Sequence, residues 1–253
     1  MIRNRVIPLL LFMNGGLVKS KKFKNHVYVG DPINTIKIFN TKEVDELIFI
    51  DIDASKLNRE PNYKLISEIA SECFMPLTYG GGVKNIEQAR KIFSLGVEKI
   101  SFQSSVIDNM DFITELAKEF GSQSIVISID VKKSLFGNYL LYNASTKTKL
   151  KINLTDYIKN VEIAGAGEIL VNSVDNDGVM SGLDTKLIEL VSHDVNIPII
   201  ASGGIGSLKN IKEGIDSGAD AVAAGSFFVF KGSHNAVLIS YPKYSELQKL
   251  LEN

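Results

Sequence analysis

The stretch Pro198-Ile-Ile-Ala-Ser-Gly-Gly-Ile-Gly206 decides the fold prediction, because it runs from a short apolar strand into a glycine-rich turn. A helical pattern begins near Ser207, and the next apolar run ends in Gly225-Ser226. Glycines let backbone N–H groups approach an anion closely, and the N-terminus of a following helix favours negative charge. Two neighbouring strand ends of this kind predict a phosphate cradle.

An earlier stretch, Pro76-Leu-Thr-Tyr-Gly-Gly-Gly-Val-Lys84, matches the first without gaps at a distance of 122 positions and continues to Gln103-Ser104. A repeat over nearly half the chain predicts two similar halves, about residues 1–122 and 123–253, each with its own cradle. In this register the matching pairs are Gly81 with Gly203, Gly82 with Gly204, Gly96 with Gly218, Ser104 with Ser226, Glu46 with Glu168 and Asp53 with Asp175.

Length and charge limit the class of protein. A chain of 253 residues suits one large α/β domain, which buries ~75% of its unfolded surface. The formal net charge of −1 gives no sign of a nucleic acid or a membrane surface as partner. No run approaches the ~20 apolar residues of a membrane span, and residues 6–13 lack a signal-peptide cleavage site. We therefore expect a cytoplasmic protein.

The residues that commonly bind metals are sparse. Cys73 is the single cysteine, so the chain forms no internal disulfide and no thiolate metal site, and we interpret it as a buried structural thiol. The three histidines are scattered along the chain. Asp51 and Asp53 form a short acidic pair, which we interpret as hydrogen-bonding groups rather than metal ligands. The sequence predicts no metal and no cofactor.

Apolar runs alternate with helical patterns along the chain. We expect strands at 6–12, 47–52, 77–79, 99–102, 124–129, 169–172, 197–201 and 221–224. We expect helices at about 32–40, 62–73, 85–95, 110–120, 155–164, 185–192, 208–216 and 244–251, a basic loop at 14–26 and an inserted β-hairpin at 134–152. Eight such units predict an α/β fold, a (β/α)8 TIM barrel made of two half-barrels, with a doubly wound sheet as the alternative.

In a (β/α)8 barrel, the residues just after the strands surround the active site at one end. The two cradles then face each other across the barrel mouth, so a ligand with phosphates at both ends fits the predicted geometry. The residues predicted at this end are Asp51, Gly81, Gly82, Gln103, Ser104, Asp130, Asp177, Gly178, Gly203, Gly204, Gly225 and Ser226.

Short motifs are spread along almost the whole chain: Gly30-Asp31-Pro32, Asp45-Glu46-Leu47, Asp51-Ile-Asp-Ala-Ser55, Gly80-Gly-Gly-Val83, Phe120-Gly-Ser-Gln123, Gly165-Ala-Gly-Glu-Ile169, Asp177-Gly178 and Ala201-Ser-Gly-Gly204. With these motifs, the chain resembles HisF, the cyclase subunit of imidazole glycerol phosphate synthase. In that family, a separate glutaminase docks under the barrel and releases ammonia, which crosses the barrel and reacts with a bisphosphorylated ribulosyl intermediate. The products are imidazole glycerol phosphate and a carboxamide ribotide.

The resemblance implies roles for several residues. It places two phosphate sites on Gly82, Ser104, Asp177, Gly178, Gly203, Gly204, Gly225 and Ser226, and it places Lys19 in a mobile loop over the substrate. It also implies that Arg5, Glu46, Lys99 and Glu168 gate an ammonia channel at the barrel floor. From position alone, these four charges favour a stabilising plug, because buried charges neutralise one another and floor residues often serve stability. With the resemblance, we favour the gate.

One of the two catalytic acids of the family is absent. Asp130 matches the acid at the end of strand five, but the position of the acid on strand one is occupied by Leu11, within Leu9-Leu10-Leu11-Phe12. Leucine cannot exchange a proton, so two-carboxylate acid/base chemistry is lost. Gln103 also replaces the asparagine of the family.

These departures favour delivery of ammonia for another use. The chain resembles a HisF-like branch that acts with a HisH-like glutaminase and a sugar amidotransferase to turn an acetamido sugar of surface polysaccharides into an acetamidino sugar. We therefore predict a synthase-like, lyase-class subunit of a glutamine amidotransferase complex that binds a phosphorylated small molecule. The alternatives are a true cyclase, in which Asp51 or Lys19 assists Asp130, and a scaffold that only activates the glutaminase.

Overall fold

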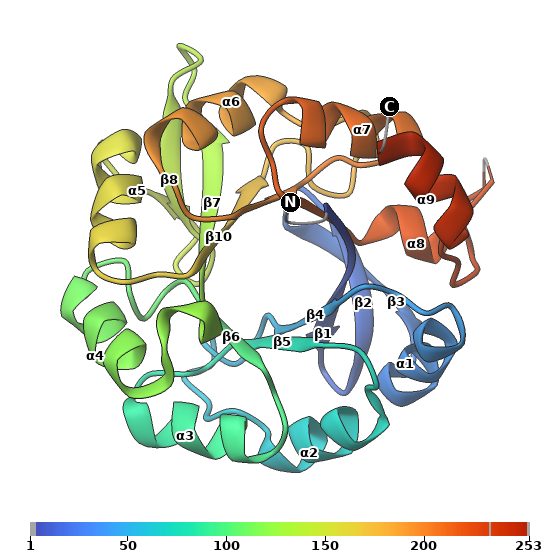
Figure 1. Cartoon of the computed structure of the whole chain (residues 1–253), viewed down its shortest axis with the longest axis horizontal. Coiled ribbons are helices and arrows are strands. Elements are labelled where there is room, and N and C mark those ends of the chain that lie inside the picture. Colours follow the sequence, from blue (N-terminus) through green and yellow to red (C-terminus); the bar gives the residue numbers. More distant parts are fainter. Residues whose placement is uncertain (1–3, 233, 252–253) are drawn as a thin grey trace.

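The computed structural model describes residues 4–232 and 234–251, and it forms a closed barrel of parallel strands surrounded by helices (Figure 1). The strand order returns to its start, because β12 pairs with β1. The predicted (β/α)8 TIM barrel is therefore confirmed. The barrel strands, in order, are β1 (Arg5–Met13), β4 (Leu47–Asp51), β5 (Leu77–Gly80), β6 (Lys99–Phe102), β7 (Ile125–Lys133), β10 (Glu168–Ser173), β11 (Ile199–Ser202) and β12 (Ala221–Ala224).

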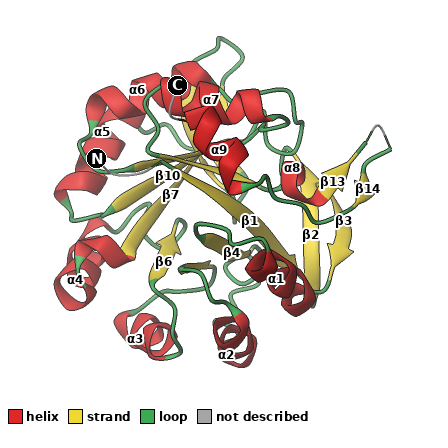
Figure 2. Cartoon of the chain, turned by 45° about the vertical axis from the view of Figure 1, so that its right-hand side comes forward, coloured by secondary structure: helices red, strands yellow, loops and turns green. Residues whose placement is uncertain are grey.

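Helices between the strands form the outer ring of the barrel (Figures 1 and 2). Most begin where an Asp, Asn or Ser side chain accepts a hydrogen bond from the first turn, as Asp31 does at α1 and Ser207 does at α7. The helices are α1 (Pro32–Thr41), α2 (Tyr63–Glu72), α3 (Ile86–Ser94), α4 (Met110–Phe120), α5 (Leu154–Ile163), α6 (Thr185–Asp194), α7 (Leu208–Asp216), α8 (Ser226–Val229) and α9 (Tyr244–Leu251), with a 3-10 turn at Ser122–Ser124.

The sequence repeat appears in the boundaries of the elements. Helices α1, α2 and α3 begin and end 122 positions before α5, α6 and α7, and β5 and β6 stand in the same relation to β11 and β12. Local hydrogen bonds repeat as well: the Leu77 N–H donates to Glu98 at 2.8 Å, and the Ile199 N–H donates to Asp220 at 2.9 Å. The two halves therefore share local structure as well as sequence.

The barrel strands are buried on both faces, as their continuous apolar runs predict. One apolar cluster fills the space inside the barrel and includes Ile7, Ile48, Val126, Leu170 and Ile200. A second, larger cluster packs the outer face of the strands against the helices. Because side chains alternate along a strand, six of the barrel strands contribute to both clusters, whereas β5 and β6 contribute apolar side chains only to the outer one.

Three segments differ from the sequence prediction. Residues 14–26, expected as a loop, form β2 (Gly16–Lys21) and the start of β3 (Lys24–Gly30), because β1 continues past the barrel and pairs with β2. The expected separate hairpin at 134–152 instead uses β7 itself, which continues to Lys133 and pairs with β8 (Tyr139–Asn143), followed by β9 (Thr148–Lys149). The short α8 and the hairpin of β13 (Phe230–Lys231) and β14 (Ala236–Val237) were not predicted.

No helix in the described part of the chain is long and apolar enough to span a bilayer.

Candidate active site at the barrel mouth

A cavity of about 830 Å³ opens at the carboxyl ends of the barrel strands. Every residue predicted at the mouth lines it, from both halves of the barrel. Their presence in one cavity follows from the fold, whereas their roles in binding stay predictions. These residues are Lys19, Asp51, Gly81, Gly82, Gln103, Ser104, Asp130, Asp177, Gly178, Gly203, Gly204, Gly225 and Ser226.

The two glycine turns have the same geometry. Gly81 has φ +115°, and a Cβ there would lie 2.2 Å from the carbonyl oxygen of Asp51. Its counterpart Gly203 has φ +93°, and a Cβ there would lie 2.6 Å from the carbonyl oxygen of Ser173, which follows Asp51 by 122 positions. Both turns need glycine for its backbone conformation and for its lack of a side chain.

One cradle amide already has a partner within the chain. The Gly82 N–H donates to Ser55 Oγ at 3.2 Å, so it is not free for an anion as the sequence prediction assumed. The reason is that the loop after β4 folds back over the turn after β5. A phosphate in this cradle therefore has to compete with the Ser55 hydroxyl.

Lys19 extends from β2 into the mouth. Its Nζ donates to the Leu9 carbonyl oxygen at 2.5 Å, and its ammonium group lies beside Gly225. Burial lowers the pKa of Lys19 to about 8, against the opposing influence of the Asp177 carboxylate. Burial raises the pKa of Asp177 to about 6, while Lys19 and the Ser20 hydroxyl oppose that rise. The hairpin that carries Lys19 is therefore coupled to the loop after β10.

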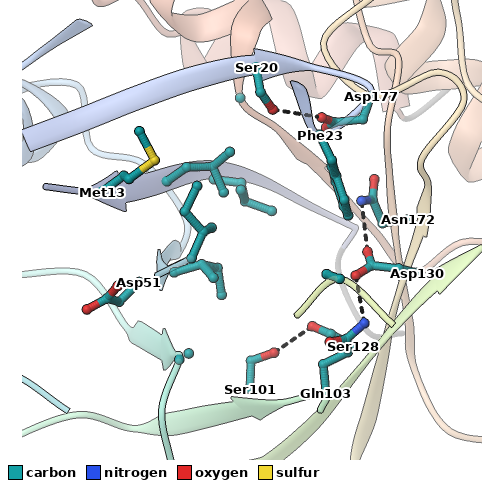
Figure 3. A pocket seen from close by; sticks show the side chains of 18 of the residues that line it. Met13, Ser20, Phe23, Asp51, Ser101, Gln103, Ser128, Asp130, Asn172 and Asp177 are labelled. Atoms are coloured by element: carbon teal, nitrogen blue, oxygen red, sulfur yellow. Dashed lines mark hydrogen bonds between the residues drawn. The ribbon is translucent and has the colours of Figure 1, made fainter. Parts of the chain in front are cut away.

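Asp130, near the carboxyl end of the barrel part of β7, is the buried carboxylate at the centre of one wall of the mouth (Figure 3). Its two oxygens accept hydrogen bonds of 3.0 Å from Gln103 Nε2 and Asn172 Nδ2. Gln103 Nε2 also donates to the Tyr142 carbonyl oxygen at 2.9 Å, which ties β6 to the β8 insertion. Burial raises the pKa of Asp130 to about 7; the Asn172 hydrogen bond lowers it and Asp177 raises it further.

Leu11 is the counterpart of Asp130 in the first half-barrel. Leu11 pairs with Ile50 on β4, whereas Asp130 pairs with Asn172 on β10, and Ile50 and Asn172 are themselves 122 positions apart. Both residues line the same cavity. The wall opposite Asp130 therefore presents leucine where a second carboxylate would complete an acid/base pair.

Asp51 is committed to its own loop. Its Oδ1 accepts the N–H groups of Asp53 and Ala54, both at 3.1 Å, and Arg59 lies 3.7 Å away. Burial raises its pKa, and these three donors oppose that rise. Figure 3 places Asp51 on the far side of the mouth from Asp130. Within residues 4–232 and 234–251, no group of three or more His, Cys, Asp or Glu residues is arranged to hold a metal ion.

The four charges predicted at the barrel floor form one closed ring. Arg5 donates to Glu46 and to Glu168, each at 2.6 Å, and Lys99 Nζ lies 3.2 Å from Glu46 and 2.9 Å from Glu168. Thr78 adds a hydrogen bond of 3.0 Å to Glu46. Burial lowers the pKa of Arg5, but the two carboxylates outweigh it and the net pKa is raised. The ring closes the end of the barrel opposite the mouth.

Sequence reasoning missed Ser101, Ser128, Asn172 and Phe23, all of which line the cavity. The Ser101 and Ser128 hydroxyl oxygens lie 2.7 Å apart. Strand alternation carried a usable signal, because Ser128 and Asp130 are two positions apart on β7 and therefore face the same side. Phe23 lies at the turn between β2 and β3, the segment expected as a loop.

The fold and the cavity define an enzyme-type (β/α)8 barrel, built from two similar halves, with polar residues gathered at the carboxyl ends of its strands. Residues 5–235 match the family model described as histidine biosynthesis protein. The chain is 51% identical over 248 residues to a Pseudomonas aeruginosa protein with the provisional name imidazole glycerol phosphate synthase subunit hisF2, covering 98% of this chain and 99% of that protein.

Two further relatives give the same result. A Leptospira borgpetersenii protein, provisionally named imidazole glycerol phosphate synthase subunit HisF, is 47% identical over 254 residues, with 99% of each chain covered. Imidazole glycerol phosphate synthase subunit HisF of Dictyoglomus thermophilum is 41% identical over 230 residues, with 91% of each chain covered. The chain belongs to the HisF family.

Proposed function

We propose that this chain is the barrel subunit of a glutamine amidotransferase complex that passes ammonia from a HisH-like glutaminase to an acceptor other than the substrate of the cyclase. The observation that carries the proposal is Leu11, which lines the same cavity as Asp130 and stands where a second carboxylate would be needed. Two-carboxylate chemistry needs a proton donor and a proton acceptor, and leucine is neither. The candidate acceptor is an acetamido sugar bearing phosphate, which a sugar amidotransferase partner converts to the acetamidino sugar.

The barrel interior supports passage of neutral ammonia. Above the floor ring, the apolar cluster of Ile7, Ile48, Val126, Leu170 and Ile200 fills the inside of the strands. Transfer of an ion into such surroundings is very costly, whereas a small neutral molecule avoids that cost. The two cations of the ring, Arg5 and Lys99, have side chains that are about 20% and 19% exposed, and we expect their movement to open the ring. We expect the glutaminase to dock on this floor face.

The second candidate is a true imidazole glycerol phosphate synthase cyclase of histidine biosynthesis. Two observations favour it: both glycine turns are present, and the pKa of Asp130 near 7 suits a general acid or base at neutral pH. The names of the relatives also describe this activity. Under this alternative Asp130 works with Lys19, because Asp51 is held by its own loop.

The experiment that separates the two candidates supplies ammonium salt and the bisphosphorylated ribulosyl intermediate to the purified chain without a glutaminase. We expect cyclisation to be ~10²–10⁴-fold slower than an ordinary turnover of ~10 s⁻¹, since one acid/base group is missing. Turnover within about tenfold of that rate would establish the cyclase and exclude the proposal.

A second arm tests ammonia transfer itself. The chain, a HisH-like glutaminase and a sugar amidotransferase are combined with amide-¹⁵N glutamine and an acetamido sugar nucleotide, and the product is followed by mass spectrometry. We expect ¹⁵N in the acetamidino group, protected from dilution by unlabelled ammonium in the buffer. Full dilution of the label, or equal rates when this chain is omitted, would contradict transfer through the barrel.

A further inference from the structure

A two-stranded ribbon projects from the mouth end of the barrel and carries two large apolar side chains at its tip. It forms where β7 continues past the barrel and pairs with β8, and Figure 1 shows it, beside the label β8, extending beyond the ring of helices. Leu135 is 100% exposed and Phe136 is 92% exposed. Single exposed apolar residues are common, whereas two adjacent ones, open to solvent at a projecting tip, mark a contact surface.

The tip is a built turn that is braced at its base. Ser134 Oγ accepts the Phe136 N–H at 3.2 Å, and Gly137 has the positive φ of 84° that closes the turn. At the base of the ribbon, the Tyr139 hydroxyl donates to Asp184 at 2.7 Å. The apolar tip is therefore held in one position before anything binds to it, which lowers the entropy cost of docking.

The ribbon is strongly basic, although the net charge of the whole chain is only −1. Residues 131–155 contain five lysines and no Asp or Glu. The two acids at its base, Asp175 and Asp184, both bond to Lys133, through its backbone N–H at 2.8 Å and its Nζ at 2.7 Å. Within residues 4–232 and 234–251, the other four lysines have no carboxylate partner; they are Lys132, Lys147, Lys149 and Lys151.

This combination fits an anionic lipid surface better than a second protein. A stable protein interface buries about 800 Å² on each partner, whereas this tip offers two side chains at the end of a narrow projection. A bilayer takes apolar side chains in below its headgroups and attracts nearby lysines, and it needs no matching shape. We infer that the ribbon is a peripheral membrane-docking element: Leu135 and Phe136 enter the bilayer surface, and the four unpaired lysines contact anionic headgroups.

Docking through the ribbon places the mouth beside the bilayer. Three residues of the turn between β8 and β9 line the mouth cavity, namely Ala144, Ser145 and Lys147. The ring of charges at the floor lies at the opposite end of the barrel, so a membrane and a glutaminase can be bound at the same time. The inference goes beyond the proposed function, and none of its steps depends on which molecule accepts ammonia.

The chain contains no tryptophan, so a single introduced one reports on the tip. Phe136→Trp is mixed with vesicles of phosphatidylcholine and phosphatidylglycerol, or with vesicles of phosphatidylcholine alone. We expect a blue shift of the emission, and quenching by brominated acyl chains, at about tenfold lower lipid concentration with the anionic vesicles. Phe74→Trp is the matched control: Phe74 is 84% exposed and precedes β5 at the floor end, and its emission should not change.

Vesicle flotation then tests the apolar part and the basic part of the ribbon separately. Leu135→Ser/Phe136→Ser should weaken binding to the anionic vesicles about 10- to 100-fold, because both large apolar side chains are lost. Lys147→Gln/Lys151→Gln should weaken it about 10- to 30-fold, and added salt should release the wild type. All four positions except Leu135 and Phe136 keep polar side chains, and circular dichroism checks the fold of each variant.

Lys64→Gln/Lys118→Gln removes the same charge from exposed positions on α2 and α4 and should bind like the wild type. Equal binding by this variant and by Lys147→Gln/Lys151→Gln would overturn the inference. So would flotation that the two serine substitutions leave intact, or a tip tryptophan that stays in water. Binding to polyglutamate without binding to anionic vesicles would also overturn it, and would indicate an acidic protein instead. These measurements contain no glutaminase and no acceptor, so their outcome is independent of the ammonia-transfer assay.

Discussion

Replacing Asp130 by asparagine should stabilise the protein at neutral and alkaline pH, although the residue lies in the candidate site. Asp130 is buried, and its pKa is raised from 3.8 to about 7 in the folded chain. Between these values the folded protein holds a proton that the unfolded chain has released, so stability falls as pH rises. A difference of about 3 in pKa, at about 1.36 kcal/mol per unit, gives about 4 kcal/mol.

The asparagine variant avoids this loss because it carries no charge at any pH. The site can accommodate its amide, since Asn172 Oδ1 has no partner in the described residues and accepts a hydrogen bond if its own amide turns over. We therefore expect the two proteins to have similar free energies of unfolding near pH 4. By about pH 8 the variant should be more stable by about 4 kcal/mol, the difference opening between about pH 4 and pH 7.

Urea unfolding followed by circular dichroism, repeated across this pH range, measures the difference directly. Asp216→Asn is the matched control, because it removes a carboxylate that is 55% exposed on the outer helix α7. That control should change stability by less than about 1 kcal/mol at every pH. If the free energies of unfolding of the wild type and Asp130→Asn change with pH in parallel, the reasoning is refuted. Asp130 would then have the same pKa in the folded and the unfolded chain.

Three further predictions follow from other contacts. Lys99→Met leaves Arg5 as the single cation beside Glu46 and Glu168 and should lower the free energy of unfolding by about 3 kcal/mol. If the unpaired carboxylate causes the loss, urea unfolding should show that Lys99→Met/Glu168→Gln regains stability. Phosphate should raise the melting temperature of the wild type, and Ser226→Asp should remove that shift by repulsion, whereas an unchanged shift would place the anion elsewhere. Partial burial raises the pKa of Cys73 to about 12, so Ellman's reagent should react slowly at pH 8, and fast reaction would contradict the raised pKa; the side chain is half-buried rather than buried as the sequence predicted.

The barrel could be predicted because each local signal agreed with its neighbours. Buried parallel strands read as continuous apolar runs, and capping residues such as Asn85 and Ser207 mark where helices begin. The hairpin of β2 and β3 was missed because the lysines between Lys19 and Lys24 hide the strand pattern. The hairpin tolerates Lys21, Lys22 and Lys24 because they lie at its exposed end.

The site was predictable only in part, for a geometric reason. Residues that directly follow a strand, such as Gly81 and Gly203, can be placed at the mouth from the chain alone. The hydrogen bond from Gly82 to Ser55 depends on how a loop folds back, which no local pattern encodes. The contact between Asn172 and Asp130 depends on the register of β7 against β10, which was not available before the strands were paired.

The comparison of the two halves locates chemistry in a way that neither half does alone. A duplicated barrel begins with equivalent residues at equivalent places, and the turns at Gly81 and Gly203 keep that equivalence. Stability alone gives no reason for Asp130 to differ from its counterpart Leu11, because a buried unpaired carboxylate destabilises the fold and leucine does not. We therefore expect that Asp130 is retained for a function. A reaction that needs acids on both sides of its substrate does not fit an arrangement with one carboxylate and one leucine.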